Sequence, residues 1–258
     1  MAFEQLMLAL TGMGVGIIIG MIGVGGGSLM TPLLIGPFKL ATNLAITTDL
    51  VFAFLVKSFA TYFHNRHGSI DYHALVYVGG AGALGALGGS LLFSYLHGYY
   101  PETFEANIRI AIGSLLVFSA IINIFFFIKK SNRLQFSLKF LDNKAGKLVL
   151  GFLVGAVVAL TSVGAGAIVV ILLMQVWRVP IDKIVGTDLA IALMIIGIAS
   201  VSHLMVSAVE MSVIAPLVGG GIIGSYVGEK IHTKMPNQAL KYLVTVVIGV
   251  VGVNLMVH

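Results

Sequence analysis

The chain has 258 residues, of which 58% are hydrophobic and 10% charged, and its mean hydropathy is +1.04. This composition is typical of polytopic membrane proteins and excludes a soluble globular domain. Cysteine is absent, which excludes disulfides, thiolate metal sites and cysteine nucleophiles. No basic region with a cleavage site precedes the first apolar run, so we expect a retained membrane segment and not a removable signal peptide.

The first uncharged run, residues 6–36, is too long for one membrane helix. As a continuous helix it would measure about 46 Å, whereas the hydrocarbon core is ~30 Å thick. Five glycines between Gly20 and Gly27, followed by Pro32, predict a break with proline in the next first turn. The helix that begins near Gly27 or Ser28 would direct free N–H groups and the positive end of its dipole at the break, which favours an anion.

The rest of the chain repeats this pattern. We expect a second broken helix at 148–176, which contains Thr161, Ser162, Gly164 and Gly166. Transmembrane helices are predicted at 44–63, 74–96, 104–128, 184–206, 211–228 and 239–257. A basic linker, residues 129–147, separates the two sets.

The two halves align without a gap at an offset of 139 residues, with 15 identities in 73 pairs between 20–92 and 159–231. The identities fall on Gly25 and Gly164, on the Thr48-Asp49-Leu50 and Thr187-Asp188-Leu189 triplets, and on His64 and His203. We conclude that one unit was duplicated, giving a first repeat over 1–128 and a second over 148–258.

Loop charges distinguish two topologies for these repeats. If each broken segment is a re-entrant hairpin that returns to its own side, each half crosses three times and the repeats are inverted. Twelve basic residues then share one face and only Lys39 and Arg109 lie on the other, whereas full crossings would give seven on each. The positive-inside rule favours inversion, with the linker cytoplasmic and both chain ends outside. The first leg of the first broken segment, residues 6–23, fits a re-entrant hairpin least well, because it is long enough to span the membrane by itself.

The predicted fold class is therefore an all-α polytopic membrane protein of two inverted-topology repeats, each a re-entrant or broken helix plus three transmembrane helices. The net charge of +5 is explained by the linker, which holds six basic residues, so we expect a topology signal and no nucleic-acid partner.

The two glycine breaks are the candidate anion site, because irregular backbone at membrane depth persists only where protein or a water-filled cavity satisfies it. The alternative is close helix packing through small residues. The candidate substrate-binding residues are Gly25, Gly26, Gly27, Ser28, Thr31, Thr48, Thr161, Ser162, Gly164, Gly166 and Thr187. A packing role is instead expected for the helically spaced sets Gly82, Gly85, Gly89 and Gly221, Gly224, Gly228.

Asp49 and Asp188 are candidate coupling residues. A carboxylate inside a membrane helix costs at least ~2.5 kcal/mol and usually has a function. Repulsion by a bound anion is removed when the carboxylate takes a proton, so proton coupling is one interpretation. The alternative is that each braces the start of a neighbouring half-helix, and the two roles are compatible.

Lys57, His64 and His203 are candidate gate residues. Lys57 has Ile196 at its repeat-related position, and we favour snorkelling of its ammonium toward the headgroups over a position facing the cavity. His64 and His203 are expected at opposite membrane edges, in gates or interfacial hydrogen bonds. We expect no metal site, because the histidines have no carboxylate cluster beside them.

The Gly-Val-Gly-Gly-Gly-Ser stretch at 23–28 with Pro32, the Thr48-Asp49 pair, the basic linker and the degenerate second copy resemble the sulfite exporter TauE/SafE family of inner-membrane permeases. The second copy departs at Ala165 and Ile171. The resemblance implies movement of small sulfur-containing anions such as sulfite, sulfonates or sulfoacetate across the inner membrane.

We therefore expect a gradient-driven secondary transporter and not an enzyme, with no cofactor. A passive anion channel is the alternative function. Its partners would be a small inorganic or organic sulfur anion and the lipid bilayer, with a homodimer as an open alternative for its assembly.

Overall fold

The computed structural model describes residues 2–22, 27–66, 68–128, 143–163, 169, 173, 179–232, 246, 249–250 and 252–255. Regular structure in these ranges is helical, as expected. The elements are α1 (Ala2–Ile22), α2 (Gly27–Ile35), α3 (Thr42–Arg66), α4 (Tyr72–Ala74), the π-helical segment η1 (Leu75–Gly79), α5 (Gly80–Tyr99), α6 (Pro101–Ile128), α7 (Lys144–Thr161), α9 (Ile181–Leu204) and α10 (Met211–His232).

Seven segments of the described chain are long and apolar enough to cross a membrane, which confirms a polytopic all-α protein. They include α1 and α7, the first legs of the two broken segments, so each of these legs has the length of a full span. The helix expected at 239–257 lies largely outside the described residues. The helix α7 begins at Lys144, so the end of the expected linker is helical.

The predicted break in the first segment is confirmed, because α1 ends at Ile22 and a separate helix begins at Gly27. The expectation for Pro32 was wrong, since it lies in the second turn of α2 and not in the first. A proline there removes one intrahelical N–H bond from a helix of only nine residues.

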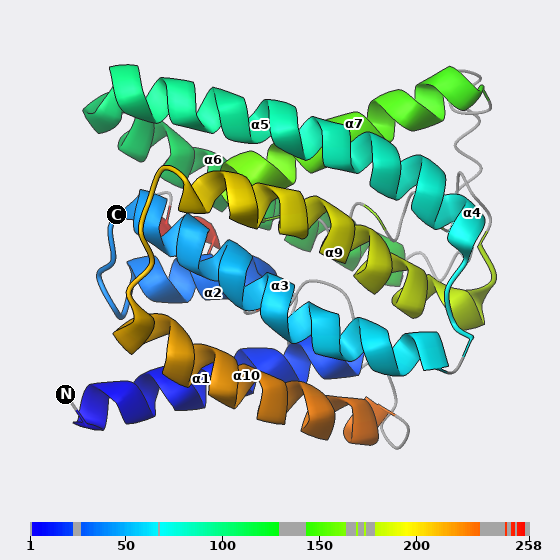
Figure 1. Cartoon of the computed structure of the whole chain (residues 1–258), viewed down its shortest axis with the longest axis horizontal. Coiled ribbons are helices and arrows are strands. Elements are labelled where there is room, and N and C mark those ends of the chain that lie inside the picture. Colours follow the sequence, from blue (N-terminus) through cyan, green and yellow to red (C-terminus); the bar gives the residue numbers. More distant parts are fainter. Residues whose placement is uncertain are drawn as a thin grey trace.

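Helices α3 and α9 pack against each other at the centre of the molecule (Figure 1). On one side α1 pairs with α10, and on the other α5 pairs with α7. Under the offset of 139 residues, α1 corresponds to α7 and α10 to α5. The two outer pairs are therefore equivalent, and each joins the first leg of one repeat to the glycine-rich helix of the other. The repeats interlock and do not form separate domains.

Glycine permits the close approach within both outer pairs. A Cβ at Gly85 would overlap the carbonyl oxygen of Phe152, and one at its counterpart Gly224 would overlap that of Met13. Likewise, a Cβ at Gly89 would overlap the carbonyl oxygen of Ala156, and one at Gly228 would overlap that of Ile17. Phe152 and Met13 are themselves repeat-related, as are Ala156 and Ile17. The predicted packing role of these glycines is confirmed, and the contacts obey the sequence repeat residue by residue.

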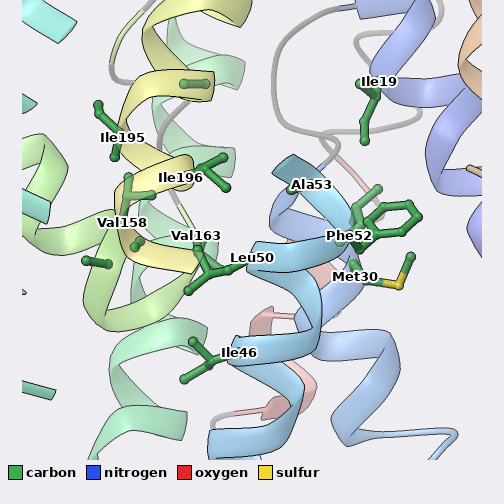
Figure 2. Packing of buried hydrophobic residues seen from close by; sticks show 14 of the residues in the cluster. Ile19, Met30, Ile46, Leu50, Phe52, Ala53, Val158, Val163, Ile195 and Ile196 are labelled. Carbon is green, nitrogen blue, oxygen red and sulfur yellow. The ribbon is translucent and has the colours of Figure 1, made fainter. Parts of the chain in front are cut away.

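The central helix α3 is covered on two sides by apolar side chains. Figure 2 shows Val158, Val163, Ile195 and Ile196 on one side of α3, and Ile19 and Met30 on the other. Each of these side chains is at most 2% exposed. Thr48, Asp49 and Lys57 of α3 are among the buried polar residues of this region.

The glycine-rich helices are irregular at matched positions. The π-helical turn η1 contains Tyr77, and the repeat-related position in α10 is Pro216, a proline inside the helix. A π-turn and an internal proline both interrupt the regular hydrogen-bond ladder. Each helix is thus interrupted just before the stretch that packs through glycine.

Repeat-related helices run in opposite directions in Figure 1. Helix α3 runs from left to right in this view, whereas α9 runs from right to left. Opposite directions are what an inverted duplication requires. The inverted-repeat arrangement and the orientation of the chain in the membrane stay predictions.

Neighbouring glycines provide matched tests of this packing. A Cβ at Gly220 would overlap the carbonyl oxygen of Ala9, whereas one at Gly219 would meet nothing within 4 Å. We expect Gly220→Ala to lower the melting temperature in detergent, because the α1–α10 pair must separate. Gly219→Ala should leave it unchanged or raise it, since alanine favours helix by about 1 kcal/mol. Equal melting temperatures for the two variants would contradict the close-packing interpretation.

Candidate functional site

The carboxylate of Asp49 joins three segments of the chain. Its Oδ2 accepts hydrogen bonds from the Thr31 hydroxyl at 2.6 Å, the Thr31 backbone N–H at 3.2 Å and the Ser162 hydroxyl at 2.7 Å. Thr31 belongs to α2 and Ser162 follows α7, so one carboxylate on α3 links both repeats. Asp49 is fully buried. The bracing role considered for this aspartate is therefore present in the structure.

Ser162 has a strained backbone at this junction. It ends α7 with φ 58° and ψ −3°, in the left-handed region, and its N–H bonds to the carbonyl of Val158 at 2.7 Å. A non-glycine residue in this region costs roughly 1–2 kcal/mol. The bond from the Ser162 hydroxyl to Asp49 offsets this cost and turns the chain after α7 toward α3.

Asp188, the counterpart of Asp49, has no such partners. Its carboxylate is fully buried, and neither oxygen has a hydrogen-bond partner in the described part of the chain. The reason lies in the sequence: Val170 replaces Thr31 in the second repeat, and Gly23 stands at the position of Ser162 in the first. The duplicated aspartates thus have the same place in the fold and different surroundings.

Lys57 lies among these charges. Its side chain is only 2% exposed, and its ammonium interacts electrostatically with Asp188 and with Asp49. The expectation that Lys57 snorkels to the headgroups was wrong. Snorkelling needs a path along the lipid face of the helix, whereas the Lys57 side chain is enclosed by packed helices.

The predicted hydroxyl ligands are placed as follows. Thr48 and Thr187 are buried beside their aspartates, and the Thr187 hydroxyl accepts the N–H of Asp71 at 2.8 Å. Asp71 in turn caps α4 through the N–H of Ala74. The Thr161 hydroxyl bonds to the carbonyl of Val157 at 2.7 Å. The structure therefore gives Thr31, Ser162, Thr161 and Thr187 hydrogen-bond partners within the protein, which a substrate would have to exchange.

Several predicted site residues lie outside the described residues, namely Gly25, Gly26, Gly164 and Gly166. Gly27 and Ser28 begin α2 and His64 lies in α3, but the side chains of Ser28 and His64 are not among those described.

His203 lies in a cluster that the sequence does not indicate. Its ring is 1% exposed and stands 4.2 Å from the ring of Phe93 between centroids, with the carbonyl of Ala159 beside it. Neither of its nitrogens reaches a hydrogen-bond partner in the ranges the structure describes. Phe93 also stacks on His97, whose Nε2 lies 3.1 Å from Asn43 Nδ2. His203 therefore contacts an aromatic ring and makes no hydrogen bond within the described ranges, and its predicted role in a gate stays a prediction.

The sequence did contain a signal for the charge arrangement. When the two halves are aligned, Lys57 has Ile196 at its counterpart position and Thr31 has Val170, although the Thr-Asp pairs between them are identical. Such unmatched polar positions mark the places where the repeats have diverged. Among the described residues, no group of three or more histidine, aspartate or glutamate side chains is placed to hold a metal ion.

A model of the family "Sulfite exporter TauE/SafE" matches residues 8–255. The chain belongs to this family of membrane transporters. It is 30% identical over 257 residues to the "Probable membrane transporter protein YjnA" of Bacillus subtilis, covering 96% of this chain and 98% of that protein. It is 23% identical to the "Probable membrane transporter protein MJ0441" of Methanocaldococcus jannaschii, covering 97% and 94% respectively. No solved structure matches the chain significantly.

Substitutions at Ser162 test the junction between the repeats. Ser162→Ala removes the hydrogen bond to Asp49 and keeps the strained backbone, whereas Ser162→Gly removes the bond and relieves the strain. We expect both to lower the melting temperature, and the alanine variant to be less stable than the glycine variant by about 1 kcal/mol. The order of the two melting temperatures in detergent is the measurement, and a more stable alanine variant would contradict the assigned backbone conformation.

Proposed function

We propose that this member of the TauE/SafE family is a gradient-driven secondary transporter of small sulfur-containing anions in the inner membrane. The observation that supports it best is the set of three buried ionisable groups, Asp49 and Lys57 on α3 and Asp188 on α9, on two helices that pack against each other. Ionisable groups inside a membrane helix bundle are costly and mark ion or substrate pathways. The family name supports the sulfur anion as substrate class.

The proposed binding region lies where the broken segments meet α3 and α9. The start of α2 at Gly27 provides the positive end of a helix dipole. Thr31 and Ser162 already hold one carboxylate, that of Asp49, and a carboxylate resembles a small oxyanion in its need for hydrogen-bond donors. The remaining candidates at 25–28 and 161–166, with Thr48 and Thr187, would supply further donors.

Alternating access would follow from movement of one packed group of helices against another. The glycine-tight pairs α1–α10 and α5–α7 are suited to move as rigid units. The irregular positions at η1 and Pro216 are suited to bend.

The proposed orientation can be tested by labelling, because the native chain has no cysteine. With both chain ends outside and the linker cytoplasmic, single cysteines at Tyr99 and Met205 should react with an impermeant thiol reagent in intact cells. Cysteines at Gly68 and Ala145 should react only after permeabilisation. All four positions are exposed. Labelling of Ala145 and Met205 from the same side would overturn the inverted arrangement.

Transport itself is tested with purified protein in liposomes. We expect uptake of sulfite, thiosulfate or an alkylsulfonate that saturates with concentration and that exceeds uptake of chloride. Gly25→Leu should abolish this uptake while the protein still inserts, because a side chain would fill the space at the break. Uptake that rises without saturation and ignores ion gradients would identify a passive channel instead.

A further inference from the structure

The two aspartates that the sequence treats alike are given different roles by their surroundings. We infer that Lys57 binds the transported anion and that Asp188 carries the coupling proton, while Asp49 stays ionised as a fixed brace. This inference rests on the proposed transport function and assigns its charge chemistry to named groups.

Asp49 is the fixed member because its donors are committed to it. Three hydrogen bonds converge on one carboxylate oxygen, two of them from hydroxyls at 2.6 and 2.7 Å. Donors of this kind favour the ionised carboxylate. The other oxygen, Oδ1, has no hydrogen-bond partner among the described residues. If the Asp49 side chain moved away, the Thr31 and Ser162 donors would be left unsatisfied, at a cost of about 1–3 kcal/mol for each, so these bonds hold Asp49 in place.

Asp188 is the exchangeable member because nothing in its described surroundings holds it by hydrogen bonds. Both of its oxygens are buried and without a partner among the described residues. The ammonium of Lys57 on α3 interacts with it electrostatically. The other ionisable groups on helices that pack against α9 are Asp49, Tyr62, His64 and Arg66 of α3, Tyr77 of η1, Tyr95, His97 and Tyr99 of α5, and Lys144 and Lys147 of α7. The residues named on α5 and α7 lie within the terminal turns of their helices.

Lys57 needs a negative partner at every stage of the cycle, since an unbalanced buried ammonium is costly. Without substrate, the ionised Asp188 of α9 balances Lys57 through the charge interaction between them and not through a direct hydrogen bond, since neither Asp188 oxygen has a hydrogen-bond partner among the described residues. An anion that approaches Lys57 competes with Asp188 and is repelled by it. When a proton from water adds to one Asp188 oxygen, the repulsion ends and the anion takes the place of the carboxylate. Release on the other side reverses both steps, as the O–H bond breaks and Asp188 again balances Lys57.

This exchange fixes the stoichiometry. One negative charge is replaced by another at Lys57, so one proton accompanies each monovalent anion and the cycle moves no net charge. Lys57 and Asp188 lie on α3 and α9, which belong to different repeats. Movement of one repeat against the other can therefore change their separation.

The experiment uses liposomes and methanesulfonate, which stays monovalent across the accessible pH range. For the native protein, a pH gradient of one unit, acid outside, should concentrate the anion about tenfold inside. An inside-positive membrane potential, set with potassium and valinomycin, should not concentrate it. Ser58→Ala, next to Lys57 on α3 with its hydroxyl bonded to its own helix, is the control and should behave like the native protein.

Asp188→Asn fixes the group in a neutral form that cannot titrate. We expect this variant to lose accumulation by the pH gradient and to gain accumulation by potential, about tenfold at ~60 mV, because the anion now crosses without a proton. Asp49→Asn, the repeat-related change, should lower the melting temperature, and the uptake it retains should still follow the pH gradient. Retained pH coupling in Asp188→Asn, or its loss in Asp49→Asn alone, would overturn the assignment.

Stability measurements test the pair without transport. Lys57→Met should abolish uptake and lower the melting temperature, because Asp188 is left unbalanced. The double variant Lys57→Met with Asp188→Asn should recover the melting temperature but not the uptake, which a cycle of the four proteins measures. Additive effects of the two changes would overturn the pairing. Native protein that moves no anion offered would instead overturn the proposed function, and the inference with it.

Discussion

The bond network at Asp49 is the constraint on which the rest of this structure depends. One carboxylate oxygen accepts from both polar groups of Thr31 and from Ser162, and so fixes α2 and the end of α7 to α3. These are the segments that the glycine breaks leave without continuous helical hydrogen bonding. A buried carboxylate is costly in an apolar bundle unless donors surround it, and here the donors come from the chain itself. The central helix therefore sets the positions of both broken segments relative to each other.

Around this centre the fold is symmetric where it packs and asymmetric where it is charged. Both outer helix pairs use glycine contacts at repeat-related positions, where backbone carbonyls approach too closely for a side chain. The polar positions instead diverge: the counterpart of Lys57 is Ile196, and the hydroxyl-bearing residues that bind Asp49 are replaced by Val170 and Gly23 in the other repeat. A duplicated frame that holds unlike charges gives the two halves of a transport cycle different chemistry. Because their surroundings differ, the repeat-related aspartates Asp49 and Asp188 need not have the same role.

The architecture also separates rigid from adaptable parts. The α1–α10 and α5–α7 pairs pack closely through glycine. The helical ladder is interrupted at η1, which precedes α5, and at Pro216 within α10. Movement concentrated at such interruptions would leave the glycine contacts intact. The central contact between α3 and α9, which holds the charged groups, lies between the rigid pairs and belongs to both repeats.

The sequence by itself determined the membrane class, the helical content, the break before Gly27 and the packing glycines, because these follow from hydrophobicity, helix length and small-residue spacing. It also indicated the family, through the glycine stretch at 23–28 and the Thr48-Asp49 pair. It did not determine the environment of Lys57, which was expected near the headgroups, or the contact of His203 with Phe93. Only the tertiary structure decided these, together with the difference between Asp49, whose Oδ2 accepts three hydrogen bonds, and Asp188, whose oxygens have no partner among the described residues. The physical reason is that the cost of a buried charge depends on the donors and opposite charges within a few ångströms, and these come from helices more than a hundred residues apart in the chain, such as Asp49 and Ser162.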